Sequence, residues 1–328
     1  MKILVRLPNW LGDMVMSIGF INALYSVYPG ATVGVIVKKG LEGLIEFFPE
    51  TAAVFIFSKD EFPGILGAWR FGTTIRRQGR YDLFFSLPDS FSSALIGFAS
   101  GSRKRIGYGN EGRSLLLTYP VKKKGFSHRV TEYTNLLASY SQRTVDSEKI
   151  YIRLHHSPNI DQIVFNINSE ASSRRLPIKK AIDLVTCIRE KYESRIVLIG
   201  GKNDRNYTEE LFLRLPSSNN IVNLAGKTTL AQLIELMASS RVVVTTDSGP
   251  AHLANATGTH TVVLFGAGNE LNTAPFNTDN LSIIRFGQLP CEPCRKNTCV
   301  LYGIPKCLEM LEEKLVVEMM MKGFYSDE

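Results

Sequence analysis

The chain has 328 residues, 44% of them apolar and 21% charged, a composition typical of folded globular proteins that excludes disordered, collagen-like and coiled-coil chains. At about 150 residues per domain, this length predicts two domains or one large α/β unit. The net charge of +7 favours anionic partners, such as a nucleotide diphosphate, a phosphorylated substrate or an anionic membrane surface. Nucleic acid is not expected as a partner, because no helix-turn-helix, zinc-finger or aromatic RNA-binding motif accompanies the basic clusters.

No apolar run reaches the roughly 18 residues that are needed to span a bilayer. Arg6 and Asp13 interrupt the apolar stretch at the start of the sequence, which therefore lacks the pattern of a signal peptide. We expect a cytoplasmic protein.

Strands alternate with helices along the first half of the chain. The apolar and turn patterns predict strands at 3–7, 32–37, 54–57 and 82–87, and helices at 13–27, 41–48 and 65–77. This alternation predicts an α/β fold with a mainly parallel sheet and helices on both faces.

The second half repeats the pattern, which predicts a second Rossmann-like domain. Strands are predicted at 163–167, 195–199, 221–224, 242–246 and 261–265, and helices at 179–192, 208–215, 230–238 and 250–256. The polar segment RLHHSPNID at 153–161 has no clear period, so we place the linker there, between domains 1–155 and 156–328. A last helix at 305–322 is expected to pack back on the first domain.

Ligands of open α/β sheets bind beyond the carboxyl ends of the strands, so the loops that follow strands carry the candidate site residues. The first such loop is PNWLGD at 8–13, in which Gly12 permits a tight turn. Asp13 is either an acid that stabilises the helix start or a general base that faces the ligand. The spacing alone favours neither interpretation.

The second loop is TTDSGPAH at 245–252, where a strand ends in small polar residues and Pro250 suits the first turn of a helix. Gly249 allows a ligand to approach the backbone, and the N–H groups of a helix start suit a diphosphate. The alternative is an Asp or Ser N-cap with nothing bound, and His252 as a buried polar residue. The segment 266–268, Gly-Ala-Gly, lacks the third glycine of a dinucleotide fingerprint and only weakly indicates another loop at this edge.

Two adjacent arginines, Arg174 and Arg175, follow the first strand of the second half. Guanidinium groups that face a ligand can pair with phosphate oxygens in a bidentate manner. An isolated pair of this kind is more often a solvated surface.

Four of the five cysteines lie near the end of the chain, at Cys291, Cys294, Cys299 and Cys307. The spacing C-x2-C-x4-C-x7-C could hold zinc, but the second pair lacks the tight spacing of ordinary structural sites. We therefore expect reduced thiols that pack a loop, with no metal and no other cofactor.

Together these segments resemble glycosyltransferase family 9, the ADP-heptose:lipopolysaccharide heptosyltransferases, and most closely its heptosyltransferase II branch. The resemblance covers nearly the whole chain. It rests on ILVRLPNWLGDMVMS at the start, RIGYGNEGRSLLLTYPV at 105–121, TTDSGPAHLANATGTHTVVLFG at 245–266 and the cysteine-rich tail.

The resemblance implies a GT-B fold of two Rossmann-like domains, with the acceptor bound mainly by the first and the ADP-sugar by the second. It implies that Asp13 is the catalytic base. The family's K-x-W-P motif, which contacts the donor phosphates, reads RRLP at 174–177, so charge is kept while the lysine and tryptophan are replaced. The implied donor-side residues are Arg174, Arg175, Asp204, Asp247, Ser248, Gly249 and His252. The implied acceptor-side residues are Asn9, Gly12 and Arg113.

The reaction that the resemblance implies is the inverting transfer of heptose from ADP-heptose to a hydroxyl of the lipopolysaccharide inner core, with no metal. Asp13 would take the acceptor proton, and Arg174 or Arg175 would stabilise the departing ADP together with the helix start at Gly249. The lipid A and inner-core acceptor is anionic and membrane-borne. The basic residues that could contact it at the inner face of the cytoplasmic membrane, or could simply be solvated, are Arg103, Lys104, Arg105, Arg113, Lys122, Lys123 and Lys124.

Three alternatives remain. A nicotinamide-dependent oxidoreductase should show a glycine fingerprint after the first strand, where this chain has only Gly12. A non-catalytic solute-binding or nucleotide-sugar-binding protein would share the fold, and a secreted solute-binding protein should carry an export signal. A family 9 transferase that uses another nucleotide sugar or acceptor is not separable by sequence, because sugar choice depends on contacts from several loops.

Overall fold

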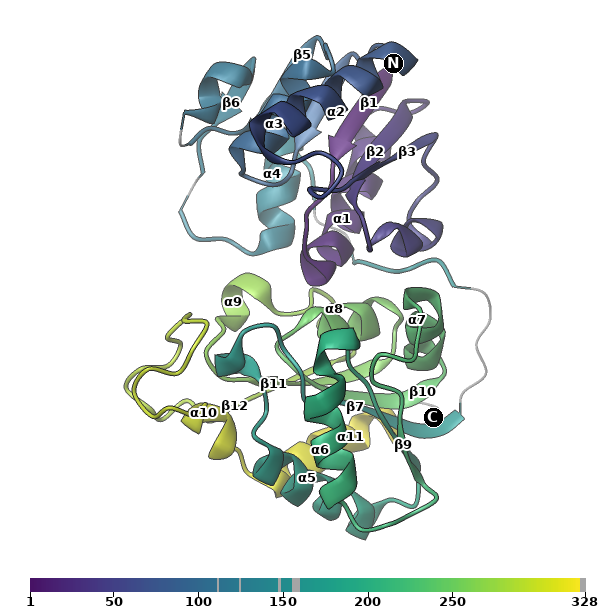
Figure 1. The fold of residues 1–328 in the computed structure, drawn as a ribbon, viewed down its shortest axis with the longest axis vertical. Coiled ribbons are helices and arrows are strands. Elements are labelled where there is room, and N and C mark those ends of the chain that lie inside the picture. The colour runs from purple at the N-terminus through teal and green to yellow at the C-terminus, as the bar shows by residue number, and fades with distance from the viewer. Residues whose placement is uncertain (111, 124, 147–148, 155–159, 325–328) are drawn as a thin grey trace. The chain divides into compact units, whose positions relative to one another are not determined.

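The computed structural model describes residues 1–110, 112–123, 125–146, 149–154 and 160–324 (Figure 1). The chain divides into two compact units, Met1–Arg153 and Leu154–Glu328. Each unit contains one six-stranded sheet whose neighbouring strands all run parallel. Most of the predicted linker at 153–161 lies outside the described residues, at 155–159.

The first sheet has the strand order β3-β2-β1-β4-β5-β6. Its strands are β1 (Lys2–Arg6), β2 (Thr32–Lys38), β3 (Ala53–Phe57), β4 (Leu83–Ser86), β5 (Lys104–Tyr108) and β6 (Tyr119–Val121). The helical segments are α1 (Leu11–Val27), η1 (Glu42–Phe47), α2 (Gly64–Gln78), α3 (Phe91–Ala99), η2 (Arg113–Leu116) and α4 (Arg129–Ser141). Helices α1 and α4 pack together, as do α2 and α3, and β1 at the centre of the sheet is buried from Ile3 to Arg6.

The second sheet has the strand order β12-β11-β10-β7-β8-β9. Its strands are β7 (Ile160–Asn166), β8 (Arg195–Leu198), β9 (Ile221–Asn223), β10 (Ser240–Thr246), β11 (His260–Phe265) and β12 (Leu281–Arg285). The helical segments are η3 (Ser172–Arg174), α5 (Ile178–Lys191), η4 (Lys202–Asp204), α6 (Arg205–Arg214), α7 (Leu230–Ala238), α8 (Gly249–Ala256), α9 (Glu270–Thr273), α10 (Lys306–Glu309) and α11 (Glu313–Phe324).

The predicted α/β class with two mainly parallel sheets is confirmed. The segment predicted as a helix at 41–48 is a 3₁₀ helix, η1. The sequence analysis did not predict strands β5, β6 and β12, helices α3, α4 and α9, or the 3₁₀ helices η2, η3 and η4. Among the described residues, no helix combines the length and the apolar character needed to cross a membrane.

The end of the chain differs from the prediction of one helix that packs on the first domain. It forms two helices, and α11 packs against β10, β11 and α5 of the second unit. Val316 and Met320 are wholly buried there. The Lys180 ammonium donates to the Leu311 carbonyl at 2.8 Å and pairs with Glu313, which fixes the start of α11 on α5.

Close packing between layers makes one helical glycine of the first unit irreplaceable. A Cβ at Gly97 of α3 would lie 2.2 Å from the ring of Phe84 on β4, whereas a Cβ at Gly19 of α1 would meet Val130 at an ordinary 3.4 Å. We expect Gly97→Ala to lower the free energy of unfolding by about 1–3 kcal/mol through overpacking. Gly19→Ala, the matched control, should be neutral or stabilising because alanine favours helix. Urea unfolding measures both, and an equal loss in the two variants would contradict this packing.

Candidate active site

Asp13 lies in the first turn of α1, directly after β1, at the carboxyl edge of the first sheet. Trp10 occupies the N-cap position, so Asp13 is a first-turn acid rather than a cap. Its side chain is 24% exposed, and its Oδ1 lies 3.5 Å from the Nε of Arg129 on α4. Burial and then the charge of Asp13 raise the pKa of Tyr133 well above its ordinary value, so this neighbour stays neutral. The carboxylate is both held in place and accessible.

Arg129 is itself part of a line of alternating charges. Its Nη1 lies 2.6 Å from the Oε2 of Glu132, and that oxygen lies 3.5 Å from the Nζ of Lys123. The same ammonium lies 2.8 Å from the Oδ2 of Asp89, in the loop after β4. This line joins α4 to two neighbouring loops and fixes the guanidinium that faces Asp13.

Arg113, which was predicted on the acceptor side, has a wholly buried side chain. Its Nη1 donates to the Pro88 carbonyl at 2.8 Å, and its Nη2 donates to the Ser86 hydroxyl at 2.9 Å. Desolvation lowers the pKa of Arg113, and the charge of Asp89, 3.8 Å away, opposes that shift. Arg113 therefore holds the loop after β4 from inside.

A buried arginine that the sequence analysis did not assign to the site also shapes the loop at 8–13. Arg6 is 2% exposed, donates to the carbonyls of Leu7 and Ile36, and donates to the Oδ1 of Asn9 at 2.5 Å. Burial lowers the pKa of Arg6 to about 10. Asn9 is thus fixed by Arg6, and Gly12 is buried in α1. The signal in the sequence was a charged residue at the end of an otherwise apolar strand.

The other basic candidates of the first unit are dispersed. Arg103 and Lys104 are exposed, whereas Arg105 donates to the Leu116 carbonyl at 2.8 Å. Lys122 is exposed, and Lys123 belongs to the charge line described above. Lys124 lies outside the described residues.

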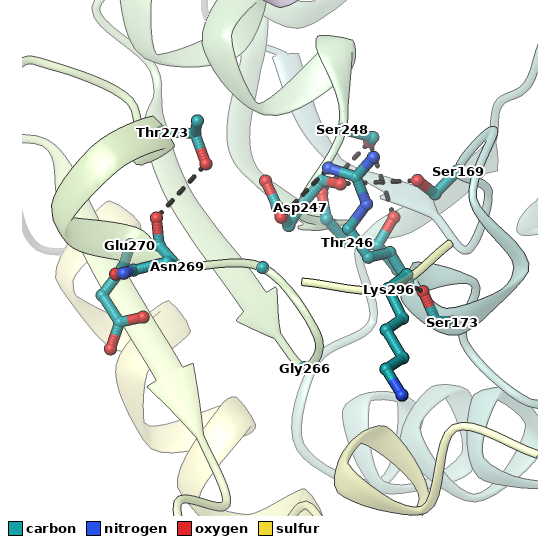
Figure 2. Close-up of polar contacts among 12 residues, drawn as sticks. Ser169, Ser173, Thr246, Asp247, Ser248, Gly266, Asn269, Glu270, Thr273 and Lys296 are labelled. Atoms are coloured by element: carbon teal, nitrogen blue, oxygen red, sulfur yellow. Dashed lines mark hydrogen bonds and ion pairs between the residues drawn. The ribbon is translucent and has the colours of Figure 1, made fainter. Parts of the chain in front are cut away.

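In the second unit, three loops meet at Asp247, just beyond β10. Its side chain is 4% exposed, and its Oδ2 lies 3.4 Å from the Nη1 of Arg174 (Figure 2). Burial raises the pKa of Asp247, and the charge of Arg174 opposes that shift. A Cβ at Gly268 would lie 1.9 Å from the same carboxylate oxygen, so only glycine fits in the loop after β11.

Small polar residues form the base of this loop cluster. Figure 2 shows Thr246, Ser248 and Ser169 gathered around Asp247. Asn166 donates to the Ser248 hydroxyl at 3.1 Å, and that hydroxyl donates to the Thr246 carbonyl at 3.1 Å, so Ser248 holds the N-cap position of α8 without capping it by its side chain.

Gly249 and His252, the two other predicted residues of the segment 245–252, lie in α8. Gly249 begins the helix and is half-buried. His252 is 6% exposed, one turn further on. Its imidazole is therefore largely shielded from solvent.

A pocket of about 180 Å³ opens beside Arg174. It is lined by Arg174, Ala267, Gly268, Asn269, Asn272, Thr273, Arg295, Lys296 and Asn297. The tail reaches this place because the Ser173 amide donates to the Asn297 carbonyl at 3.1 Å, and the Arg295 amide donates to the Ala267 carbonyl at 2.8 Å. Of the described residues that line the pocket, three are cationic and none is acidic, an arrangement that suits a phosphate-bearing ligand. The sequence analysis missed Arg295 and Lys296 because they lie among the tail cysteines.

Arg175 and Asp204 form a separate pair that does not line this pocket. The Nη2 of Arg175 lies 2.9 Å from the Oδ1 of Asp204, and its guanidinium lies 4.9 Å from the ring centroid of Tyr207. The Oδ2 of Asp204 accepts from the Gly201 amide at 2.9 Å. This pair joins η3 to η4, so the two adjacent arginines have different environments.

The four tail cysteines line one small cavity together with Glu292. None forms a disulfide, and Cys307 is buried. Burial, and then the charge of Glu292, raises the pKa of the Cys307 thiol to about 11. Within the described part of the chain, no cluster of three or more His, Cys, Asp or Glu side chains is arranged to hold a metal ion.

We predict that the purified chain holds little stoichiometric zinc or iron and that turnover persists in chelator, because a thiol with a raised pKa stays protonated at neutral pH. Elemental analysis and melting curves with and without chelator measure this. One tightly held metal ion per chain, with a lower melting temperature after chelation, would contradict the prediction. Loss of turnover without unfolding would instead place a metal in the reaction.

The sequence profile of glycosyltransferase family 9 (heptosyltransferase) matches residues 68–304. The chain is 30% identical to lipooligosaccharide heptosyltransferase 2 of Haemophilus ducreyi, over 78% of this chain and 80% of the relative. It is 28% identical to lipopolysaccharide heptosyltransferase 2 of Escherichia coli K12, over 84% of this chain and 86% of the relative.

A similar fold occurs in solved structures. The structure of E. coli ADP-heptose lps heptosyltransferase II has a TM-score of 0.83 at 24% identity and covers 100% of this chain and 99% of its own. E. coli heptosyltransferase WaaC with ADP has a TM-score of 0.78 at 14% identity and covers 98% of this chain and 100% of its own. Because the family profile covers well over half of the sequence, the chain belongs to glycosyltransferase family 9 and is a transferase with a GT-B fold.

Proposed function

We propose that this chain transfers heptose from ADP-heptose to a hydroxyl of the lipopolysaccharide inner core, with inversion at the anomeric carbon. The observation that carries the proposal is the cationic pocket beside the Asp247–Arg174 pair, a place where a diphosphate can be held. The heptosyltransferase relatives and the solved ADP complex of a family member support the choice of an ADP-sugar.

The donor diphosphate is held by the cations of the pocket. Arg174 stands at the position of the motif lysine in the resembled family, and Asp247 orients its guanidinium at 3.4 Å. Lys296 and Arg295 line the same pocket from the tail. As the bond between the anomeric carbon and the diphosphate oxygen breaks, these groups stabilise the charge that collects on ADP. Gly249 brings the start of α8 to the same sheet edge, where its amides favour negative charge.

Asp13 acts as the general base. Its carboxylate takes the proton of the acceptor hydroxyl while that oxygen attacks the anomeric carbon, so the new glycosidic bond forms as the old one breaks. Arg129 positions the carboxylate from α4, and Glu132 in turn holds Arg129. The acceptor is the anionic lipid A and inner-core oligosaccharide, met at the inner face of the cytoplasmic membrane.

The tryptophan of the family's K-x-W-P motif is replaced in this chain by a residue of the hydrophobic core. Leu176 stands in its place and is wholly buried, so it contributes to packing rather than to the open side of the pocket. Donor choice therefore rests on the pocket cations and on the neighbouring loop at 269–273. A binding and turnover panel of nucleotide sugars, with ADP-heptose beside ADP-glucose and UDP-sugars, tests the proposal. Turnover confined to a donor other than ADP-heptose would overturn it.

Asp13→Asn should lower turnover by about 100-fold or more while leaving folding and ADP affinity nearly normal, because the amide keeps the shape but loses the basicity. Steady-state kinetics and ADP calorimetry measure the two effects. Asp60→Asn, which changes an exposed carboxylate of the same unit, is the matched control. Turnover of Asp13→Asn within threefold of the unmodified chain, about 0.7 kcal/mol in barrier, would remove Asp13 from the reaction.

Arg174→Ala should weaken ADP binding by roughly 1.5–3 kcal/mol, the range of a hydrogen bond to a charged group. Arg175→Ala should leave ADP affinity nearly unchanged and lower thermal stability, because Arg175 pairs with Asp204 outside the pocket. Calorimetry with ADP and melting curves separate the two, with Arg214→Ala on α6 as an exposed control. Unchanged ADP affinity in both single variants would return the two arginines to a structural role.

A further inference from the structure

Large apolar side chains are exposed together on one helical layer of the first unit. They are Ile65, Leu66 and Trp69 on α2, Phe91 and Phe98 on α3, and Leu115 on η2. We call this surface the α2–α3 face; Figure 1 shows the two helices side by side. Leu66 and Leu115 are 78% and 90% exposed, which is far beyond the exposure of a partly packed core residue.

The two helices form one continuous surface because they approach closely. A Cβ at Gly72 of α2 would lie 2.6 Å from the Cβ of Ala99 at the end of α3. Across this contact, the rings of Trp69 and Phe98 have centroids 5.9 Å apart.

Basic side chains continue the same surface. The Arg105 guanidinium lies 5.2 Å from the ring centroid of Phe98, and its Nε donates to the Leu116 carbonyl of η2 at 2.8 Å. On α2, the helical period places Leu66, Arg70 and Arg77 on one stripe, opposite the buried side chains of the core. The stripe is apolar toward the start of α2 and basic toward its end.

Basic residues predominate on this face, and the acidic residues Asp60, Glu61 and Asp89 lie only at its border, next to the starts of α2 and α3. The segments 62–81 and 90–110 contain no Asp or Glu, and their basic residues are Arg70, Arg76, Arg77, Arg80, Arg103, Lys104 and Arg105. Asp82, 3.8 Å from Arg103, lies just beyond them. An aromatic and aliphatic patch with a predominantly basic surround is typical of surfaces that insert rings at the headgroup level and bind anionic lipid.

We propose that the α2–α3 face docks the enzyme on an anionic lipid bilayer, with Trp69 and Leu66 entering the interface and Arg70 and Arg77 meeting lipid phosphates. Charge complementarity favours this partner over a second copy of the chain, because self-association through this face would bring like charges together. The inference names a surface that the proposed transfer reaction does not require. It rests on the proposed function only for the source of the bilayer, and vesicle binding is measured without turnover.

The test is co-sedimentation of the full chain with phosphatidylcholine vesicles, with and without phosphatidylglycerol, at low and high salt. Phosphatidylglycerol should strengthen binding, and salt should weaken it. Leu66→Ser/Trp69→Ser should weaken binding to the anionic vesicles by about tenfold or more. Arg70→Gln/Arg77→Gln should remove most of the preference for phosphatidylglycerol. Leu213→Ser, which removes a 74% exposed leucine from α6 of the second unit, is the matched control and should bind normally.

Urea unfolding of each variant is the control for folding. The free energy of unfolding should stay nearly unchanged, because the changed side chains are exposed. Turnover on a delipidated acceptor should stay normal in the face variants, so failure of the transfer proposal and failure of the docking proposal are distinguishable. Unchanged vesicle binding in Leu66→Ser/Trp69→Ser, or no preference for phosphatidylglycerol, would overturn the inference. A concentration-dependent dimer in sedimentation velocity that this variant abolishes, without vesicle binding, would assign the face to a second copy instead.

Discussion

A carboxylate held against an arginine at the carboxyl edge of a parallel sheet is the interaction on which both candidate sites depend. Parallel strands bring their ends, and the loops that follow, to one edge, so polar side chains from distant parts of the sequence collect there. Charges that collect at a partly dry edge need partners, because desolvation otherwise penalises them. Asp13 meets Arg129 at 3.5 Å in the first unit, and Asp247 meets Arg174 at 3.4 Å in the second.

The two pairs differ in burial, and this difference assigns them different chemistry. The side chain of Asp13 is 24% exposed, so an acceptor hydroxyl can reach it. That of Asp247 is 4% exposed, and in the proposed reaction it orients Arg174 rather than contacting a substrate. Burial raises the pKa of Asp247, and Arg174 opposes the shift.

The sequence predicted the fold where periodicity and turns agree, and it failed where side chains disguise the pattern. Helix α1 and the central strands were found because their apolar runs end at Pro and Gly signals. Strand β5 was missed because it begins with Lys104 and Arg105, which read as a solvated loop. The segment at 41–48 has helical spacing but forms the 3₁₀ helix η1 rather than an α-helix. The last helix was placed on the wrong unit because no local pattern reveals which surface will bury its apolar stripe.

The candidate site was predictable as a set of loops but not as a set of contacts. Asp13 and the loop at 245–249 follow strands, and that position is visible in sequence. The separation of Arg174 from Arg175 is not visible, because it depends on which carboxylate each guanidinium meets in space. Arg113 was assigned to the acceptor for the same reason. An arginine is normally exposed, and the Pro88 carbonyl, the Ser86 hydroxyl and the charge of Asp89 together make its burial tolerable.

These buried arginines change what the net charge of +7 means. Arg6 and Arg113 both count toward this net charge. Their guanidinium groups, however, are buried inside the first unit, where they donate hydrogen bonds to carbonyl and hydroxyl oxygens. Exposed positive charge gathers instead in places that include the pocket cations of the second unit and the basic surround of the α2–α3 face. Net charge favours anionic partners. The burial of individual guanidinium groups shows which positive charges a ligand can reach. Among these, the cations of the small pocket suit a phosphate, whereas those of the broad α2–α3 face suit a larger ligand.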